Sequence, residues 1–211
     1  MRNVKRISTF LVLCLVSLTA CTSGPQPIED ESHEREVMAW RADKDAMFKS
    51  SSDSPLLPAD RATFTTLPYF PFDGAYRMPA RLTPESSAEP HFIELSTSST
   101  EMRRMRRVGT LGFAVKGQAL RLTAFADEND TAMARLFVPF GDQTNRGETY
   151  GGGRYIELTR TSTSLYDLDF NRAYHPYCVY NPSYVCPVPP SENRLEARIV
   201  AGERLGASKS Q

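Results

Sequence analysis

The sequence lacks several features that would assign the protein to a functional class. It carries no net charge, with 25 basic and 25 acidic residues, so it has no excess of positive charge for nucleic-acid binding. It contains no Gly-x-Ser-x-Gly or His-Glu-x-x-His motif and only three histidines. Its main apolar run, residues 7–18, is too short to span a bilayer. These absences weigh against an enzyme, although they leave carboxylate chemistry open.

Cysteine is also scarce, and one of the four cysteines has an informative position. Residues 2–6 include three basic side chains, residues 7–18 are mostly apolar, and the run ends in Leu18-Thr-Ala-Cys21. This order is typical of a secretory signal peptide. A cysteine at the cleavage point is typical of a lipobox, in which the thiol receives a lipid before cleavage. We therefore predict that residues 1–20 are a lipoprotein signal peptide and that Cys21 is lipidated.

A lipidated Cys21 would place the protein in the bacterial cell envelope. Thr22 follows it, where signals for inner-membrane retention typically have Asp, so we favour the outer membrane, facing the periplasm. Removing residues 1–20 removes three basic residues, which leaves 22 basic and 25 acidic residues and a charge of −3. We predict a tether over residues 21–30, a single globular domain over 31–206 and a disordered tail over 207–211.

The predicted domain begins with a helix and continues as strands. Val37, Trp40 and Phe48 recur at helical spacing within residues 30–49, and we expect Trp40 to anchor this helix on the core. Residues 58–64 suit one short helical turn. Later segments are rich in aromatic and β-branched residues and are separated by turn residues. The predicted strands are residues 76–82, 92–95, 103–115, 119–125, 136–140, 154–159 and 165–170.

This order predicts a mainly β (α+β) fold, an antiparallel β-sandwich or open barrel with the N-terminal helix packed on it. Lys116-Gly117 suits a two-residue hairpin turn between two of the strands. Residues 171–193 contain five prolines, which favour extended backbone without ladder hydrogen bonds. We expect this C-terminal proline-rich segment to wrap across the sheet as a loop.

Cys178 and Cys186 lie within that proline-rich segment. In an exported protein the ordinary state of two such cysteines is a disulfide. A nine-residue loop closed in this way would gain about 2.6 kcal/mol in the chain-entropy model. A metal site with His175 as a third ligand is the alternative, but the spacing fits no standard zinc pattern and no fourth ligand is evident. We predict a disulfide, no metal and no cofactor.

A polar, glycine-rich loop at residues 140–155 is the main candidate for chemistry. Asp142, Glu148 and Arg154 could form a charged site, with Asp169 and Asn171 at the end of the next strand. Two carboxylates near an arginine suit acid/base work or sugar binding. The alternative is a structural loop in which Asp142 closes a turn and Arg154 pairs with a carboxylate, and we favour it.

The chain resembles a family of unknown function, DUF1684, over most of residues 37–204. The residues that carry this resemblance are Trp40-Arg41, Phe48, Ser54-Pro-Leu56, residues 67–73, Tyr76-Arg77, residues 136–140, Asp142, Thr144, residues 148–150, residues 153–155, residues 169–171, Ala173-Tyr174, Pro176, Cys178, Tyr180, Cys186-Pro187, Pro189-Pro190, Glu192-Asn193 and residues 201–203. The family usually has asparagine where this chain has His175, which weakens His175 as a ligand or base.

The resemblance implies membership of the family but no mechanism, because the family has no established activity. It also implies a shared binding site among polar positions at strand ends. The full set of candidate site residues is Asp142, Thr144, Glu148, Tyr150, Arg154, Tyr155, Asp169, Asn171, Tyr174 and Asn193.

The leading functional hypothesis is a lipid-anchored binding or interaction module of the envelope, and catalysis is the less favoured option. Its partners would be the membrane, through the lipid, and an envelope small molecule, polymer or protein. The alternatives are a carboxylate-dependent hydrolase of an envelope polymer and a purely structural lipoprotein. Converging carboxylates in a deep cleft would favour the hydrolase. The same side chains paired to arginines would favour the binding module.

Overall fold

The computed structural model describes residues 30–86 and 89–206. The predicted signal peptide, the lipidated Cys21, most of the predicted tether and the predicted tail lie outside the described residues. None of the helices in the described part is long and apolar enough to cross a membrane.

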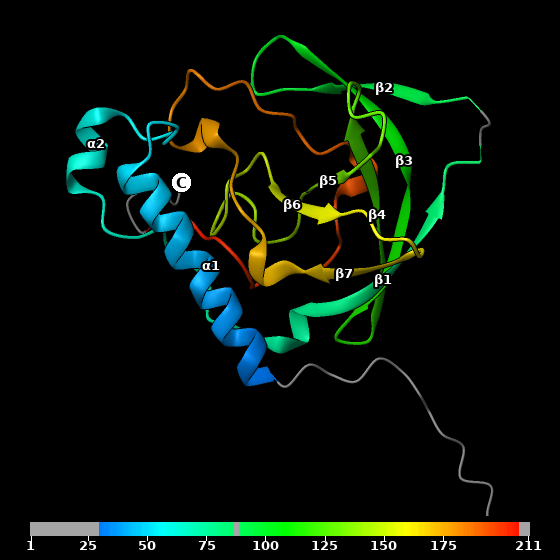
Figure 1. Ribbon diagram of the computed structural model, residues 1–211, viewed down its shortest axis with the longest axis horizontal. Helices are drawn as coiled ribbons and strands as arrows, with labels where there is room; N and C mark the ends of the chain where they lie inside the picture. Colours follow the sequence, from blue (N-terminus) through cyan, green and yellow to red (C-terminus); the bar gives the residue numbers. More distant parts are fainter. Residues whose placement is uncertain (1–29, 87–88, 207–211) are drawn as a thin grey trace, which may run out of the picture.

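The described part of the chain contains two α-helices followed by seven strands (Figure 1). The predicted N-terminal helix and all seven predicted strands are confirmed, with ends that differ by a few residues. The elements are α1 Asp30–Ser50, α2 Pro58–Thr63, β1 Arg77–Pro84, β2 His91–Ser96, β3 Met102–Val115, β4 Gln118–Asp127, β5 Arg135–Phe140, β6 Arg154–Thr159 and β7 Leu165–Asp169.

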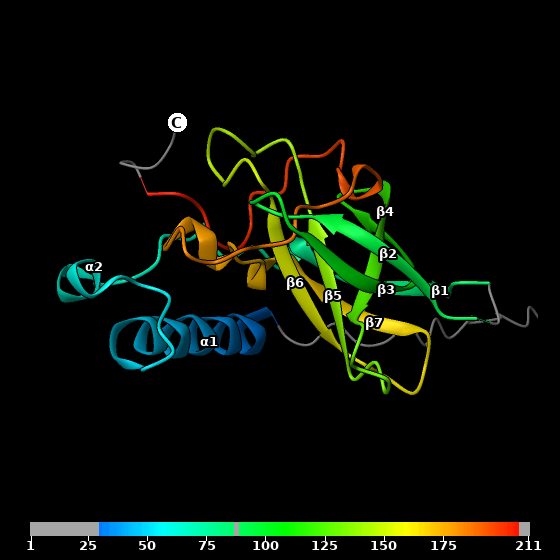
Figure 2. The same ribbon diagram turned by 90° about the horizontal axis from the view of Figure 1, so that it is seen from above.

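The strands form one antiparallel sheet in the order β6-β5-β4-β3-β1-β7, with β2 paired to β3. The sheet curls so that its terminal strands β6 and β7 approach each other, which gives a nearly closed barrel (Figures 1 and 2). The open barrel is therefore the correct one of the two predicted architectures. Both helices lie to one side of it (Figure 2).

The long strand β3 pairs with two partners along one edge. Its first half pairs with β2 and its second half with β1, and the register with β4 shifts between Arg107 and Gly109. A Cβ at Gly109 would lie 2.3 Å from the carbonyl oxygen of Thr83 in β1. Only glycine allows this close approach, and the bulge bends the sheet where the partner changes.

The β3–β4 hairpin has the two-residue turn predicted from its sequence. Lys116 and Gly117 have φ angles of 48° and 84°. Positive φ at both positions is the requirement of a type I′ turn, whose twist matches that of the flanking strands.

The main hydrophobic core fills the barrel. Leu111, Leu122, Val138, Leu168 and Ile199 are among its fully buried members. A smaller cluster on β2–β4, formed by Leu95, Met105 and Phe125, is separate from this core. The sheet therefore buries apolar side chains on both of its faces. For this reason residues 122–126 of β4 are all buried, without the usual alternation of buried and exposed side chains.

Helix α1 is attached to the barrel largely through polar contacts. Its buried side includes Val37 and Phe48, and also His33, Arg41 and Lys44, at spacings of three and four residues. Nε2 of His33 lies 3.0 Å from a carboxylate oxygen of β7, and Arg41 donates to two backbone carbonyls. Buried polar groups need such partners. Because hydrogen bonds are directional, these contacts fix the orientation of α1 on the barrel, in addition to the apolar contacts.

Trp40 does not anchor the helix in the core as we expected. It is half-buried and belongs neither to the two apolar clusters described above nor to a third one, formed by Phe48, Leu56 and Leu67. The physical reason is the helical rotation, because Val37, Arg41 and Phe48 define the buried side and Trp40 lies at its margin. This places its indole on an open groove, described below.

The chain after β7 has little regular structure and covers the barrel. The proline-rich part pairs only at single bridges, such as Thr97 with Pro187 and Tyr155 with Tyr174. The last part, residues 194–201, alternates between exposed and buried residues and adds Leu195 and Ile199 to the core. The predicted wrapping loop is confirmed, and it continues into an extended C-terminal segment, residues 194–206.

Candidate functional site

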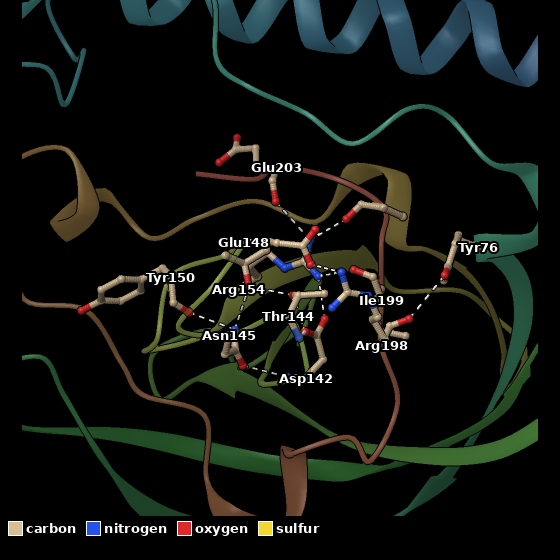
Figure 3. Close-up of polar contacts among 12 residues, drawn as sticks. Tyr76, Asp142, Thr144, Asn145, Glu148, Tyr150, Arg154, Arg198, Ile199 and Glu203 are labelled. Atoms are coloured by element: carbon tan, nitrogen blue, oxygen red, sulfur yellow. Dashed lines mark hydrogen bonds and ion pairs between the residues drawn. The ribbon is translucent and has the colours of Figure 1, made fainter. Parts of the chain in front are cut away.

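A buried arginine lies where the glycine-rich loop meets the C-terminal segment (Figure 3). Arg154 begins β6, is fully buried, and its Nη2 donates to Oδ2 of Asp142 at 2.6 Å. Its remaining bonds go to carbonyls of the C-terminal segment, at Ile199 (2.8 Å), Ala201 and Glu203 (3.1 Å). A buried charge is tolerated only when it is paired and hydrogen-bonded, and both terminal nitrogens of Arg154 are bonded, whereas its Nε has no hydrogen-bond partner among the described residues. Arg154 therefore connects β6 to the C-terminal segment.

The electrostatics of this arginine are those of a buried ion pair. Burial lowers the pKa of Arg154, and the Asp142 carboxylate opposes that shift. The guanidinium is a donor without an acceptor lone pair, and here its terminal nitrogens are taken up by Asp142 and by backbone carbonyls, so it is not placed to serve as a base. The pair is suited to holding the fold and poorly suited to proton transfer.

The loop after β5 closes on itself around Asp142. Oδ1 of Asp142 accepts the backbone N–H of Thr144 at 2.6 Å and its hydroxyl as well. Asn145 accepts the N–H of Asp142 at 2.7 Å and donates to Oγ1 of Thr149 and to the carbonyl of Tyr150, both at 2.9 Å. This is the structural loop that we favoured, with side chains that replace a strand ladder.

The glycine immediately before Arg154 allows the proline-rich segment to pack here. Gly153 has φ +95°, and a Cβ on it would lie 2.6 Å from the carbonyl oxygen of Phe140 and from Cγ of Pro189. The position therefore needs glycine both for its backbone angle and for the close approach.

Asp169 and Asn171 form a second polar group, which joins β7 to the N-terminal part of the chain. Asp169 contacts His33 of α1 and accepts from the backbone and side chain of Asn171 at 2.9 and 3.0 Å. Asn171 also exchanges hydrogen bonds with the backbone of Asp73 at 3.1 and 3.0 Å, and its carbonyl accepts from Arg41. No hydrogen bond or ion pair among the described residues links this group to Asp142.

Two further candidates have separate structural partners. Glu148 forms an ion pair with Arg198 at the surface. Asn193 is fully buried and bridges two strands, accepting from the N–H of Thr123 at 2.7 Å and donating to the carbonyls of Thr123 (2.8 Å) and Pro139 (2.7 Å). The three candidate carboxylates thus have different partners and do not line a common cleft.

Of the three remaining candidates, Tyr155 and Tyr174 lie together on a groove of about 970 Å³ between α1, strands β3–β6 and the proline-rich segment, whereas Tyr150 does not line it. Tyr155 and Tyr174 pair through their backbones at 2.8 and 3.0 Å, and their rings meet edge-on with centroids 5.7 Å apart. Phe137 packs edge-on against Tyr155 at 4.7 Å. The aromatic residues of the lining are Trp40, Phe137, Tyr155, Tyr174, Tyr177 and Tyr184.

The phenols of Tyr155 and Tyr174 stay neutral at ordinary pH. Burial raises the pKa of Tyr155, and burial together with nearby Glu157 raises that of Tyr174. Their hydroxyls can therefore donate, Tyr155 to the carbonyl of Pro187 and Tyr174 to Glu157 at 3.0 Å. The groove presents neutral aromatic rings with a few fixed hydrogen bonds at their edges.

The cations that line the groove are all paired. Arg103 lies 2.7 Å from Asp127, and Arg135 lies 3.5 Å from Glu157. Lys44 forms an ion pair with the fully buried Glu203.

Acidic side chains outnumber basic ones in the lining of the groove. The lining also includes Asp43 and Asp130, and neither has an ion pair among the described residues. The groove therefore offers no unpaired positive charge and two carboxylates without an ion pair, although that of Asp130 accepts the N–H of Arg135 at 3.2 Å.

Lys44 is held at the base of the groove by aromatic rings as well as by Glu203. Its Nζ lies 4.4 Å from the ring centre of Tyr174 and 5.5 Å from that of Trp40. Such contacts favour an ammonium group over an aromatic face. Glu203 also accepts from the N–H of His175 at 2.7 Å and from the hydroxyl of Tyr180 at 2.9 Å, so the pair belongs to a larger buried network.

Cys178 and Cys186 are free thiols in the structure, without the disulfide that we predicted. The N–H of Cys178 donates to Sγ of Cys186 at 3.3 Å. The segment is held without a covalent link, because Ser98 donates its N–H to the carbonyl of Cys186 at 2.8 Å and accepts the N–H of Cys186 on its hydroxyl at 3.0 Å.

The alternative of a metal site at these cysteines gains no support from the geometry. Within residues 30–86 and 89–206, no three His, Cys, Asp or Glu side chains are grouped so that they could hold a metal ion. His175 is buried, accepts the N–H of Tyr150 on Nε2 at 3.3 Å, and lies 3.6 Å from Glu203 through Nδ1.

Sequence reasoning missed the Lys44–Glu203 pair and most of the groove. Lys44 and Glu203 are 159 positions apart, so no local pattern links them. The sequence did contain a signal for the side of α1 that lines the groove. The lining residues Trp40, Asp43, Lys44 and Met47 follow helical spacing and therefore share one side of the helix. The alternation over residues 194–201 was also readable as an extended, half-buried segment.

Comparison with known proteins agrees with this architecture. Residues 62–204 match the model of a family described as a protein of unknown function (DUF1684), so the chain belongs to that family. A solution NMR structure of an uncharacterized protein from Haloarcula marismortui is similar, with 38% identity and a TM-score of 0.65 over 83% of this chain and 95% of that chain. A search of the curated proteins found no match.

Proposed function

We propose that this member of the DUF1684 family is a binding module of the bacterial cell envelope and that the aromatic groove is its ligand site. The observation that carries the proposal is the groove itself, about 970 Å³ and lined by six aromatic side chains. Ligand sites are typically concave and mostly apolar, with a few placed polar groups. The tyrosine hydroxyls and rim carboxylates supply those polar groups.

The charges of the groove define the ligand. With every lining cation paired and with the carboxylates of Asp43 and Asp130 not neutralised by a cation, an anion would meet repulsion and no partner. A neutral or cationic amphipathic molecule fits, its apolar part on the aromatic rings and its polar part at the rim. This chemistry also argues against a nucleic-acid partner.

The contacts of the three candidate carboxylates support a binding module rather than a hydrolase. Asp142 is paired with Arg154, Glu148 with Arg198, and Asp169 with His33. A general acid or base has to reach the proton that it transfers. None of these three carboxylates lines the groove, so no observation favours catalysis there.

We propose further that the module is held at the outer membrane, facing the periplasm, by lipid on Cys21. The support is the order of residues 2–21, with a basic start, an apolar run and a lipobox. In cells, Cys21→Ser should block processing and release the protein from the membrane fraction. Unchanged processing and membrane association in that variant would contradict the anchor and leave the groove proposal untouched.

The binding proposal is tested with Nile red, a neutral apolar fluorescent probe, added to the purified protein. We expect the wild type to bind the probe and the double variant Trp40→Ala/Tyr184→Ala to bind at least about tenfold more weakly, since each ring supplies apolar contact area. The control is Met38→Ala, which changes an exposed residue of α1 outside the groove.

Native mass spectrometry of protein purified from its own membranes then identifies the natural ligand. A wild type that binds neither the probe nor any copurified molecule would support the purely structural role instead.

A further inference from the structure

A second pocket, of about 340 Å³, opens at the mouth of the barrel, and the proposed function does not use it. We call it the barrel-mouth pocket. Its lining includes Leu82, Leu136 and Tyr166, which belong to the main core of the barrel. Among the described residues, only Leu136 lines both this pocket and the aromatic groove. Mouths of β-barrels are common places for ligand sites, so the polar side chains around this opening bear on what the protein binds.

Strand β3 places an arginine on the inner side of this opening. Arg106 is directly opposite Ala126 of β4, which follows the core residues Leu122 and Ala124 at intervals of two. Residues that are opposite each other on neighbouring strands share one face of the sheet, so Arg106 lies on the face that continues into the barrel. Arg103, three positions earlier, lies on the other face and lines the groove.

Arg106 is half-buried and has no partner of opposite charge. Neither an ion pair nor a side-chain hydrogen bond joins it to the described part of the chain. The lining acid Glu85 is engaged by Arg107, 2.8 Å away, and by His91, 3.7 Å away, and the other lining acid, Glu89, is exposed. A guanidinium without an acid keeps its N–H donors available for water or a ligand. Arg106 therefore differs from the cations of the groove, which all have carboxylate partners.

Arg160 supplies a second cation at the rim of the pocket. Its backbone N–H donates to the carbonyl of Ala134 at 3.0 Å, and its Nη1 donates to the carbonyl of Ala132. These two bonds hold the side chain against the loop before β5. Its Nε and Nη2 make no hydrogen bond or ion pair with the described residues. The pocket therefore contains two arginines without a counter-ion.

The turn between β6 and β7 adds hydroxyl groups to the lining. Thr161 donates to the carbonyl of Thr163 at 2.6 Å, which holds the turn closed. The N–H of Leu82 donates to the carbonyl of Ser164 at 2.8 Å, which fixes the turn to β1. Ser162 and Ser164 line the pocket, and their hydroxyls make no hydrogen bond within the described ranges. The turn thus presents two hydroxyl donors on a fixed backbone.

We propose that the barrel-mouth pocket binds the phosphate group of a small molecule, with Arg106 and Arg160 as its charged partners and the hydroxyls of Ser162 and Ser164 as further donors. Guanidinium groups bind phosphate oxygens through paired, charge-assisted hydrogen bonds. The donors come from β3 on one side and from the turn after β6 on the other. Donors on two walls suit a tetrahedral group with many acceptor positions better than a planar carboxylate.

The volume of the pocket limits the size of this ligand. A volume of about 340 Å³ is at the lower end of the range of small-molecule sites. It leaves room for a small organic group beside the phosphate. The proposal does not rest on the groove, because the two sites share no polar lining residue. Their charges also differ, since the groove repels anions and the barrel-mouth pocket attracts them.

The test is isothermal titration calorimetry of the purified full chain at fixed ionic strength, with inorganic phosphate and glycerol 3-phosphate as probes. We expect saturable binding of both probes and at least about tenfold weaker binding of acetate. Arg106→Gln should weaken phosphate binding at least about tenfold, because a charge-assisted hydrogen bond is lost. The matched control is Arg104→Gln, two positions earlier on β3. Arg104 lies over the ring of Phe92 and outside the pocket, and its loss should change binding less than about twofold.

Two further variants separate charge from geometry. Arg106→Lys keeps the charge but loses the planar fork, so we expect a several-fold loss. This variant also keeps the test decisive if Arg106→Gln does not fold, as judged by circular dichroism. The double variant Ser162→Ala/Ser164→Ala keeps every charge and should also lose several-fold in affinity.

The absence of saturable phosphate binding in the wild type would overturn the proposal. Equal losses in Arg106→Gln and Arg104→Gln would do the same, because they would indicate attraction to the general charge of β3. Acetate that binds as tightly as phosphate would overturn the choice of phosphate. Vesicles of phosphatidylglycerol test a lipid headgroup as the source: Arg106-dependent binding to vesicles, without binding of the soluble probes, would overturn the small-molecule ligand.

The groove proposal stands or falls separately from this one. Nile red should bind Arg106→Gln as it binds the wild type, and Trp40→Ala/Tyr184→Ala should retain full phosphate affinity. Loss of phosphate binding in the groove variant would contradict a separate site at the barrel mouth.

Discussion

The buried centre at Asp142 and Arg154 and the aromatic groove differ in how many of their polar side chains have hydrogen-bond or ion-pair partners within the protein. The buried centre around Asp142 and Arg154 has a partner for the carboxylate and for both terminal nitrogens of the guanidinium (Figure 3). The groove has aromatic faces, two carboxylates without an ion pair at Asp43 and Asp130, and space for a ligand. Polar residue types alone would have pointed to the first region.

Polar groups that already have hydrogen-bond partners within the protein indicate how the chain folds rather than what it binds or catalyses. A buried ion pair needs every partner that it has, so its residues are constrained whatever the protein binds. A binding surface keeps unused capacity for hydrogen bonds and apolar contact. We therefore propose that the glycine-rich loop holds the C-terminal segment in place and that the groove meets the ligand.

Arg154→Met should have the largest effect on stability. It leaves Asp142 buried without its counter-ion and frees three carbonyls of the C-terminal segment. Breaking a buried pair on one side costs about 3–5 kcal/mol of unfolding free energy. Urea denaturation followed by circular dichroism measures this. The control Arg198→Met removes an exposed arginine of the same segment and should cost less than about 1 kcal/mol. Similar losses in both variants would contradict the special role of Arg154.

Asn193→Ala should have the next largest effect. The substitution leaves the N–H and carbonyl of Thr123 and the carbonyl of Pro139 without their partner in a buried region. Unsatisfied buried groups cost about 1–3 kcal/mol. The urea midpoint should fall accordingly, and Asn193→Asp should not restore it, since it replaces the donating amide. A midpoint equal to that of the wild type would show that the clamp is dispensable.

Trp40→Ala should separate binding from stability. The indole is half-buried, so we expect a loss of only about 1 kcal/mol in unfolding free energy, together with weaker binding of Nile red. The same urea series and a probe titration provide both numbers. A loss as large as that of Arg154→Met would mean that Trp40 supports the core after all.

The rim pair between Arg103 and Asp127 should have the smallest effect. The N–H of Asn129 and then Arg103 lower the pKa of Asp127 below its ordinary value. Its contribution to stability is therefore present above the ordinary pKa near 3.9 and is lost as the pH falls through the lowered folded value. Asp127→Asn should cost no more than about 0.5 kcal/mol at pH 7, and nothing by about pH 2. A cost that grows in acid would reverse the assigned sign.

Local signals in the sequence predicted most of the fold. The helix of α1 follows from its spacing and from the absence of glycine and proline, and the strands follow from aromatic and β-branched runs between turn residues. The change of partner along β3 was not predictable, because it depends on the contact between Gly109 and Thr83. The burial of residues 194–201 was missed because that segment pairs with the barrel through single bridges and side chains, without a hairpin signal.

The candidate site was predicted less well, for a physical reason. The sequence marks polar residues near turns but does not show whether their bonds are satisfied by distant carbonyls, as those of Arg154 are by residues 199–203. The groove combines α1, four strands and the proline-rich segment, so no single stretch reveals it. Tyr155 and Tyr174 were named as candidates through the family resemblance, and they proved to be part of the groove lining.

Nile red binding to two matched variants tests the central claim most directly. Asp142→Asn keeps the size and shape of the side chain but removes the negative charge that pairs with Arg154. The double variant Trp40→Ala/Tyr184→Ala alters only the groove. We predict that folded Asp142→Asn binds the probe with wild-type affinity, while the groove variant binds at least about tenfold more weakly. Loss of binding in Asp142→Asn with retention in the groove variant would contradict the account.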